Sequence, residues 1–308
     1  MALIDLFQQS PALFVTVAGV LGLLVGSFLN VVIYRLPVMM ERDWQEGCRH
    51  YLEQQAAAKA TDNTAVDLTV GDPGDSTPPP AVEKFNLAYP PSRCSACDAQ
   101  IKAWQNIPII SYLLLKGKCA HCKTGISVRY PIIEFITALL TVIVALHFGP
   151  SLQAVAGIGI TWCLITLTMI DFDTQLLPDS ITLPLMWAGL IASTLPVFAT
   201  TNDALFGAAF GYLSLWSIYW LFKLVTGKEG MGYGDFKLLA ALGAWLGWQA
   251  LPVIILLSSV VGAVVGIALI IATRRGKDIP IPFGPYLATA GWAAMLWGDT
   301  LVALYGIN

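Results

Sequence analysis

Apolar stretches of about 20 residues recur along this chain, separated by short polar turns. A stretch of this length is what an α-helix needs to cross the hydrocarbon core of a bilayer. We count eight candidate spans, near 11–33, 130–148, 153–171, 180–199, 204–224, 236–250, 251–273 and 283–305. The pattern predicts an all-α polytopic membrane protein with about eight transmembrane helices. The flank MALIDLFQQS carries no Lys or Arg, so we expect the first span to stay attached rather than act as a cleaved signal.

One long polar segment interrupts this pattern between the first and second spans. It divides the chain into a first transmembrane helix at 1–35, a loop at 36–128 and a seven-helix membrane core at 129–308. Within the loop, residues 56–80 lack aromatic side chains and are rich in Asp, Thr, Pro and Gly. Such a composition cannot bury a core, and it predicts a flexible linker at about 56–80.

Composition supports the membrane assignment. Of the 308 residues, 56% are hydrophobic and only 12% are charged, and the mean hydropathy is +0.68. A soluble domain carries about 25% charged residues. The net charge of −3 is too small to indicate a nucleic-acid partner, so the bilayer is the expected environment.

The basic residues predict an orientation. When alternate loops are assigned to alternate sides of the eight spans, all 17 Lys and Arg residues fall on one side. The positive-inside rule makes that side cytoplasmic. We therefore expect a multi-pass protein of the bacterial inner membrane, with both termini in the periplasm and the 36–128 loop in the cytoplasm.

Four cysteines in this loop form two CxxC pairs, with 21 residues between the pairs: Cys94, Cys97, Cys119 and Cys122. Four thiolates at this spacing can surround a tetrahedral ion and leave no position open for water, so we predict a structural zinc knuckle at about 90–125. Two disulfides are the alternative, but the cytoplasm is reducing. His121 could replace one cysteine as a ligand, although a solvent-facing position is the expected one.

Two acidic residues stand at the ends of apolar runs, where ionisable groups are costly unless they have a partner or a task. Asp171 closes the third span, and Asp235 precedes the sixth within a Gly-Met-Gly-Tyr-Gly-Asp segment. Both fall at the predicted cytoplasmic edge, where two carboxylates can share one proton and activate water. Gly232 and Gly234 would let the backbone bring Asp235 close to Asp171.

Simpler interpretations remain beside this one. Asp235 could be the N-cap of its helix, and Asp179 is expected to cap the fourth span. Physical arguments do not choose firmly between Asp171 and Asp173, although Asp171 directly follows the apolar run and is therefore more desolvated. The pairs Gly207/Gly211 and Gly243/Gly247 have the GxxxG spacing and predict close helix packing.

Six segments in order resemble the type IV prepilin peptidases, bacterial inner-membrane enzymes that also serve type II secretion. They are GSFLNVVIYRLP (26–37), the paired CxxC, RYPIIE (129–134), IDFDTQLLPD (170–179), GMGYGDFK (230–237) and IPFGPYL (281–287). The resemblance implies that the catalytic pair is Asp171 and Asp235. It also implies cleavage of a basic leader after a Gly in prepilins and pseudopilins, followed by methylation of the new N-terminal residue, usually Phe, with S-adenosylmethionine.

The methyl-transfer activity rests on this resemblance alone, because we find no βαβ pattern with a Gly-rich cofactor turn. Its S-adenosylmethionine site is not indicated by any motif. Glu134, an acidic residue inside the second span, is a candidate contributor. The structural alternative is an ion pair of Glu134 with Arg129 or Arg35.

Three rival functions can be weighed from the sequence. Paired carboxylates in a multi-span bundle can serve a transporter or channel, but such proteins usually place their charges near the midplane. A zinc-knuckle adaptor without catalysis would leave the aspartates unexplained. A protease that cuts other membrane proteins at the cytoplasmic edge remains open.

Overall fold

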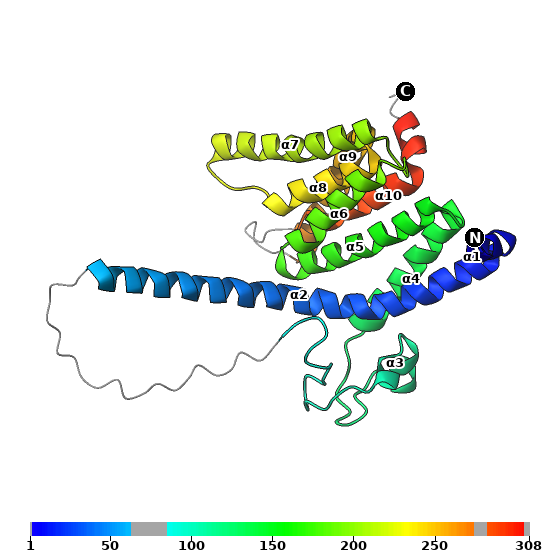
Figure 1. Ribbon diagram of the computed structural model, residues 1–308, viewed down its shortest axis with the longest axis horizontal. Coiled ribbons are helices and arrows are strands. Elements are labelled where there is room, and N and C mark those ends of the chain that lie inside the picture. Colours follow the sequence, from blue (N-terminus) through cyan, green and yellow to red (C-terminus); the bar gives the residue numbers. More distant parts are fainter. Residues whose placement is uncertain (1, 63–84, 274–281, 305–308) are drawn as a thin grey trace.

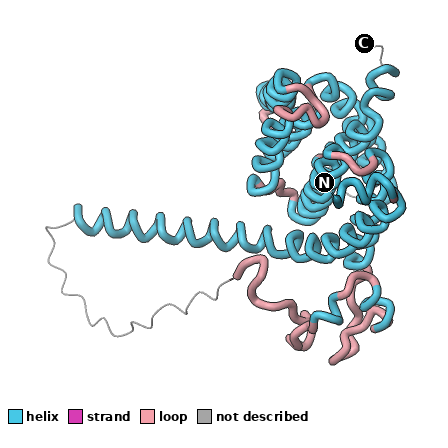
Figure 2. Tube along the Cα trace, turned by 45° about the vertical axis from the view of Figure 1, so that its right-hand side comes forward, coloured by secondary structure: helices cyan, strands magenta, loops and turns pink. Residues whose placement is uncertain are grey.

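The computed structural model describes residues 2–62, 85–273 and 282–304. Within these residues the chain is helical, without a β-strand, and it forms a bundle with one long helix projecting from it (Figures 1 and 2). A helix lies at each of the eight predicted spans: α2 (Pro11–Asp62), α4 (Arg129–Phe148), α5 (Leu152–Thr174), α6 (Asp179–Ala192), α7 (Thr201–Thr226), α8 (Tyr233–Leu246), α9 (Leu251–Thr273) and α10 (Gly284–Leu304). The shorter elements are α1 (Ala2–Gln9), α3 (Ile110–Leu114) and two 3₁₀ turns, η1 (Ala103–Asn106) and η2 (Trp248–Ala250).

The helices differ in their ability to cross a bilayer. Five of those in the described residues are long and apolar enough to do so, namely α2, α4, α5, α7 and the run of η2 and α9. Helices α6 and α8 have 14 residues each. At 1.5 Å per residue each is about 21 Å long, shorter than the roughly 30 Å hydrocarbon core. The structure therefore shows a membrane protein with at least five candidate spans among its described residues.

Helix α2 is much longer than the span predicted at 11–33. It continues without a break through Pro37 to Asp62, so the first element does not end at residue 35. A proline inside a helix removes one backbone hydrogen bond, but the residues at 38–62 are largely good helix formers, which favours continuation. Residues 41–55 are exposed, and Figure 1 shows this half of α2 projecting beyond the bundle. Residues 56–62 of the predicted linker belong to this helix, and 63–80 lie outside the described residues.

Helix α8 is the central element of the bundle. It packs against α6, α7 and α10, and all its residues from Asp235 to Trp245 are buried, except for an intermediate Lys237. A helix that is apolar on every side is stable only when neighbours surround it. Helix α8 therefore holds its first turn, which contains Asp235, in the interior of the bundle.

Helices α7 and α8 pack at close range, as the GxxxG spacing predicted. A Cβ atom added at Gly207 would lie 2.1 Å from the carbonyl oxygen of Gly243, and one at Gly243 would lie 2.2 Å from that of Gly207. A Cβ at Gly211 would lie 2.7 Å from the carbonyl oxygen of Leu239. These helices can approach so closely only because their facing positions lack side chains.

Candidate active site and cysteine cluster

Asp171 lies in the last turn of α5 and is only 5% exposed. The helix ends just after it because Gln175 adopts the left-handed conformation, with φ of 56°, and Pro178 cannot continue a helix. The backbone N–H of Gly284 donates a hydrogen bond of 3.0 Å to Oδ2 of Asp171. This contact joins the end of α5 to the beginning of α10, 113 residues later in the chain.

Asp235 lies in the first turn of α8 and is 7% exposed. The cap position of this helix is occupied by Gly232, so the N-cap interpretation of Asp235 is wrong. Its carboxylate is close enough to that of Asp171 to interact electrostatically. The end of α5 and the start of α8 thus bring two buried carboxylates together at one end of the bundle.

Leu177 packs against two glycines, Gly234 and Gly284, that lie next to the aspartates. A Cβ atom added at Gly234 would lie 2.7 Å from Cβ of Leu177, and one at Gly284 would lie 2.6 Å from Oδ2 of Asp171 and 3.3 Å from Cδ1 of Leu177. The close approach of α8 and α10 to the end of α5 therefore requires glycine at both positions. At Gly232 an added Cβ would meet no atom nearer than Oδ2 of Asp235 at 3.9 Å, so nothing in the packing requires glycine there.

The other acidic residues of this region form ion pairs. Asp173 binds Arg129 through two hydrogen bonds of 2.8 and 2.5 Å. Asp179 accepts two hydrogen bonds of 2.7 Å from Nζ of Lys237. The N-cap prediction for Asp179 is wrong, because it is the first helical residue of α6 and Pro178 holds the cap position. Of the three acids between 171 and 179, only Asp171 is buried, and it has no cationic partner among the residues that the structure describes.

Glu134 is buried in α4, at 8% exposure, and it does not form the ion pair considered from the sequence. Arg129 binds Asp173 instead, and Arg35 donates to the backbone carbonyls of residues 86, 87 and 90. Oε2 of Glu134 accepts a hydrogen bond of 2.7 Å from the backbone N–H of Ile109, and the Ser27 side chain is a second partner. Glu134 thus joins α2, α4 and the segment that leads into α3.

A small cavity lies beside this carboxylate. Its volume is about 270 Å³, and Ser27 is both a partner of Glu134 and part of the cavity wall. The remaining wall consists of Leu24, Phe28, Val31, Asn106 and Pro108. The cavity therefore lies between α2 and the polar segment that follows η1.

The four loop cysteines come together as the CxxC spacing predicted. Their sulfur atoms all lie within 4.8 Å of one another, and Sγ of Cys94 is 3.8 Å from Sγ of Cys122, too far for a disulfide. Sulfurs at the zinc–thiolate distance of about 2.3 Å form a tetrahedron with edges of about 3.8 Å. The donor set and its geometry fit one tetrahedral metal ion.

The two halves of this cluster have matching backbones. Short antiparallel bridges close each turn, between Arg93 and Gln100 and between Lys118 and Gly125. In each half the N–H of the residue after the second cysteine donates to the carbonyl of the first, and that residue has a positive φ, 55° at Asp98 and 62° at Lys123. Each half is therefore a tight knuckle that presents two thiols on one side.

Local hydrogen bonds shift the acidity of these thiols. Bonds from the Thr124 side chain and backbone lower the pKa of Cys122 to about 6, and bonds from the backbone of Cys122 and His121 lower the pKa of Cys119. The Ala99 backbone lowers the pKa of Cys97, but burial and the neighbouring thiols outweigh it and raise that pKa to about 12. Thiols packed this closely need a cation before all of them can ionise.

The remaining cysteines and His121 lie outside this cluster. His121 is exposed within the second knuckle, as expected, and Cys48 is exposed on α2. Cys163 lies within α5. The sequence indicated no role for Leu177 or Gly284. Nothing local in the segments 170–179 and 281–287, where these residues occur, shows that they come together near Asp171.

Two family descriptions match this chain. The bacterial peptidase A24 N-terminal domain matches residues 20–148, and the type IV leader peptidase family matches residues 158–267. No solved structure matches.

Curated relatives match over nearly the full length. A prepilin leader peptidase/N-methyltransferase of Stutzerimonas stutzeri is 56% identical over 302 residues, 98% of this chain and 97% of the relative. A protein of the same description from Pseudomonas aeruginosa is 52% identical over 305 residues, 99% and 98% of the two chains. One from Aeromonas hydrophila is 50% identical over 306 residues, again 99% and 98%.

Proposed function

The chain belongs to the type IV leader peptidase family, and on that premise we propose that it is a bifunctional prepilin leader peptidase and N-methyltransferase. Its substrates are type IV prepilins and type II pseudopilins. It removes their basic leader after a Gly at the cytoplasmic edge of the inner membrane, and it then methylates the new N-terminal residue, usually Phe. The observation that supports the peptidase site is the meeting of two buried carboxylates, Asp171 and Asp235.

These two residues are the catalytic pair of the peptidase. One carboxylate is ionised and removes a proton from the attacking water, while its protonated partner donates a hydrogen bond to the scissile carbonyl. Two carboxylates this close oppose one another's ionisation, which keeps one proton shared between them. The Gly284 N–H orients Asp171, and the packing of Gly234 on Leu177 places Asp235 beside it.

Substitution of either aspartate tests this assignment. In Asp171→Asn and Asp235→Asn the pair can no longer hold one charge and one proton, so we expect prepilin cleavage to fall by about 10⁴-fold or more. Asp173→Asn is the matched control, because Asp173 binds Arg129 and lies outside the pair. Cleavage is measured by mass spectrometry of a purified prepilin. Cleavage at the parental rate by either pair variant would overturn the assignment.

The protein crosses the inner membrane eight times, with both termini in the periplasm. In this topology all 17 Lys and Arg residues lie on the same side of the membrane, which supports it. In this topology α6 and α8 are also crossings, although each is shorter than the hydrocarbon core, and α8 is surrounded by other helices rather than by lipid. A prepilin that keeps its leader in the cytoplasm and its apolar helix in lipid then presents the scissile bond at the level of the aspartates.

The methyl-transfer site uses Glu134 and the adjoining 270 Å³ cavity. S-adenosylmethionine, when bound, supplies an activated methyl group to the new N-terminal amine. Glu134 does not line the cavity itself but is bonded to Ser27, which does, and a buried carboxylate behind the wall favours a cationic donor or an ammonium group. Methyl transfer from a sulfonium otherwise depends mostly on positioning a neutral amine, which the cavity wall can provide.

Two variants of Glu134 separate charge from structure. The Gln side chain of Glu134→Gln can still accept the Ile109 N–H but has no charge, so we expect methylation to fall about tenfold or more with leader cleavage retained. Glu134→Ala loses both the charge and the hydrogen bond. Mass spectrometry reports leader loss and methyl gain separately. Normal methylation by Glu134→Gln would assign Glu134 a structural role only.

Zinc is the metal that fits the cysteine cluster, held by Cys94, Cys97, Cys119 and Cys122. Four thiolate donors select zinc or an iron–sulfur centre among common metals, and four protein ligands leave no position for a reacting water. The ion therefore stabilises the knuckle domain and takes no part in peptide hydrolysis.

A further inference from the structure

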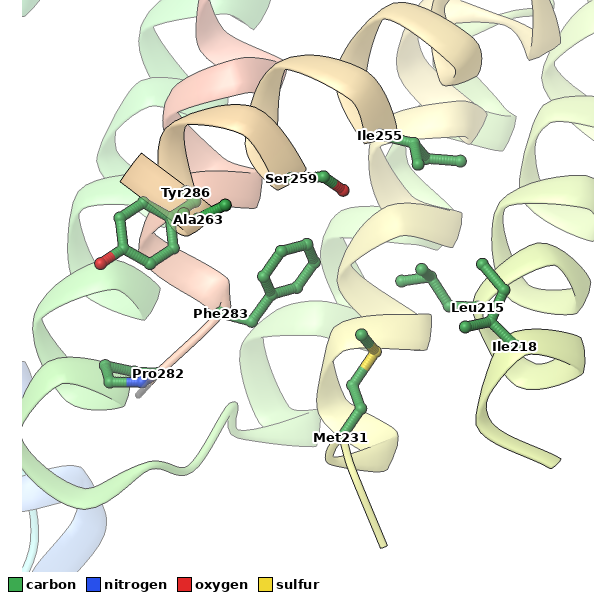
Figure 3. A pocket seen from close by; sticks show the side chains of 10 residues that line it. Leu215, Ile218, Met231, Ile255, Ser259, Ala263, Pro282, Phe283 and Tyr286 are labelled. Atoms are coloured by element: carbon green, nitrogen blue, oxygen red, sulfur yellow. The ribbon is translucent and has the colours of Figure 1, made fainter. Parts of the chain in front are cut away.

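An apolar groove opens on the side of the bundle between α7 and α9 (Figure 3). Its volume is about 330 Å³, and none of its lining residues is charged. Leu215 and Ile218 of α7 form one side, and Ser259 and Ala263 of α9 form the other, with Phe283 and Met231 between them in the figure. The wall is completed by Ile255, Gly262, Pro282 and Tyr286.

The groove results from the way the helices pair. Helix α7 packs on α8, and α9 packs on α10, whereas α7 and α9 make little direct contact with one another. Ile218 is 51% exposed, and Ser259 and Ala263 are exposed as well. Because these lining residues are exposed, the groove is open from the side of the bundle. An exposed apolar surface on membrane helices faces lipid or an apolar partner.

Two residues that line the groove, Phe283 and Met231, are chain neighbours of the segments that hold the two aspartates. Phe283 directly precedes Gly284, whose N–H binds Asp171. Met231 directly precedes Gly232 and α8, whose first turn carries Asp235. The groove therefore borders the two segments that position the carboxylates of Asp171 and Asp235.

The α9 side of the groove presents small residues on one face of the helix. Ser259, Gly262 and Ala263 have the i, i+3, i+4 spacing of such a face. Of these, Gly262 packs against the Tyr286 ring of α10, where an added Cβ atom would lie 3.2 Å from the ring, so Ser259 and Ala263 are the exposed small residues of this face. Small residues let a second helix approach closely within a membrane, which is the contact that side chains of ordinary size would prevent.

We propose that this groove binds the apolar helical segment of the substrate, the part that follows the scissile bond. The inference rests on the proposed function, because a prepilin is a basic leader followed by a long apolar helix. One face of that helix packs against the small residues of α9 and the apolar residues of α7, as amphipathic helices pack into grooves elsewhere. This contact places the peptide bond at the end of the helix next to Asp171 and Asp235.

A bulky side chain in the groove tests the proposal. Ala263→Trp fills the space between α7 and α9, so we expect kcat/KM for a full-length prepilin to fall about tenfold or more, mainly through a higher KM. Ala268→Trp is the matched control. Ala268 is exposed on the same helix and lies about two and a half turns beyond Ser259, on the opposite side. The Ala268→Trp variant should cleave the prepilin with the kcat/KM of the parent protein.

Photocrosslinking gives a second measurement that does not depend on a filled groove. A benzophenone amino acid in place of Ile218 should crosslink to the apolar segment of the prepilin, and one in place of Trp216, about half a turn away on α7, should not. Crosslinks from position 218 to lipid alone would assign the groove to an acyl chain and overturn the proposal.

The outcomes separate this proposal from the one on which it rests. Inactive Asp171→Asn and Asp235→Asn variants, together with Ala263→Trp cleaving like Ala268→Trp and no prepilin crosslink at position 218, would reject the groove and leave the peptidase assignment intact. Active aspartate variants would reject the peptidase assignment itself.

Discussion

At the scale of single residues, the proposed catalytic pair depends on two glycines that contact its surroundings. Gly284 lies against the carboxylate of Asp171, and Gly234 lies against Leu177, which also contacts the Gly284 position. Neither position has room for a Cβ atom. The backbone segments that carry Asp171 and Asp235 can meet only because these two side chains are absent.

This packing predicts different outcomes for the two glycines that precede Asp235. In Gly234→Ala the new Cβ would lie 2.7 Å from Leu177, so α8 must shift and carry Asp235 with it. Because a shift of about 1 Å at a catalytic group costs roughly 100-fold in rate, we expect kcat to fall by about that factor in Gly234→Ala and by no more than about twofold in Gly232→Ala. Steady-state cleavage of a prepilin measures both, and equal loss in the two variants would contradict this account.

The ion pairs and the burial of single residues decide among the acids between 171 and 179, a choice that the sequence left open. Asp173 and Asp179 pair with Arg129 and Lys237, and they tie α5 to α4 and α6 to α8. Asp171 is buried and pairs with no cation in the described part of the chain. The spacing of acids in IDFDTQLLPD could not show this, because the cations that neutralise two of them lie 44 and 58 residues away.

At the scale of elements, the cysteine knuckle was predicted well because its signal is local. Each CxxC pair and the turn around it occupy eight residues, so the spacing alone defines the shape. The end of α2 was predicted poorly, because Pro37 and the change from apolar to polar residues indicate the end of a span rather than the end of a helix. A helix may leave the bilayer and continue.

The knuckle predicts a metal dependence that can be measured directly. The purified protein should contain about one zinc ion per chain, and Cys97→Ser should lose it, because three thiolates bind zinc far more weakly than four. Cys48→Ser is the control, since Cys48 is exposed and lies outside the cluster. Metal content is measured by mass spectrometry.

The pH dependence of zinc retention has a definite sign. Thiols must lose their protons to bind the ion, so retention against a chelator should weaken as the pH falls. Thr124 lowers the pKa of Cys122 to about 6, which favours its thiolate at neutral pH, whereas the raised pKa of Cys97 opposes ionisation there. Retention that improves as the pH falls would contradict thiolate ligation.

At the scale of the whole molecule, the bundle places its chemistry at one end. The C-terminal end of α5 and the first turns of α8 and α10 meet there, and the ion pairs of Asp173 and Asp179 surround them. The loop that carries the cysteine cluster is attached to the bundle by two buried side chains. Arg35 donates a hydrogen bond to the backbone of this loop, and Glu134 accepts one from it. This end is the one that the positive-inside rule assigns to the cytoplasm.

Cysteine labelling in intact cells tests this orientation. Asn202→Cys places a thiol at the exposed start of α7, on the predicted periplasmic side, and it should react with a membrane-impermeant maleimide. The native Cys48, exposed on α2, should react only after the cells are permeabilised. Labelling of Cys48 in intact cells would reverse the orientation and move the aspartates to the periplasmic side.

The sequence by itself indicated the positions of the eight apolar segments and the cysteine knuckle, and it predicted the one-sided distribution of charge and the pairing of the two aspartates. These features follow from hydrophobic length, charge and short-range spacing, which the chain carries locally. The tertiary structure alone decided which acid is buried, what Glu134 binds, and where a groove opens beside the catalytic pair. Such features depend on contacts like that of Gly284 with Asp171, between residues 113 positions apart, and no local pattern encodes which distant segments meet.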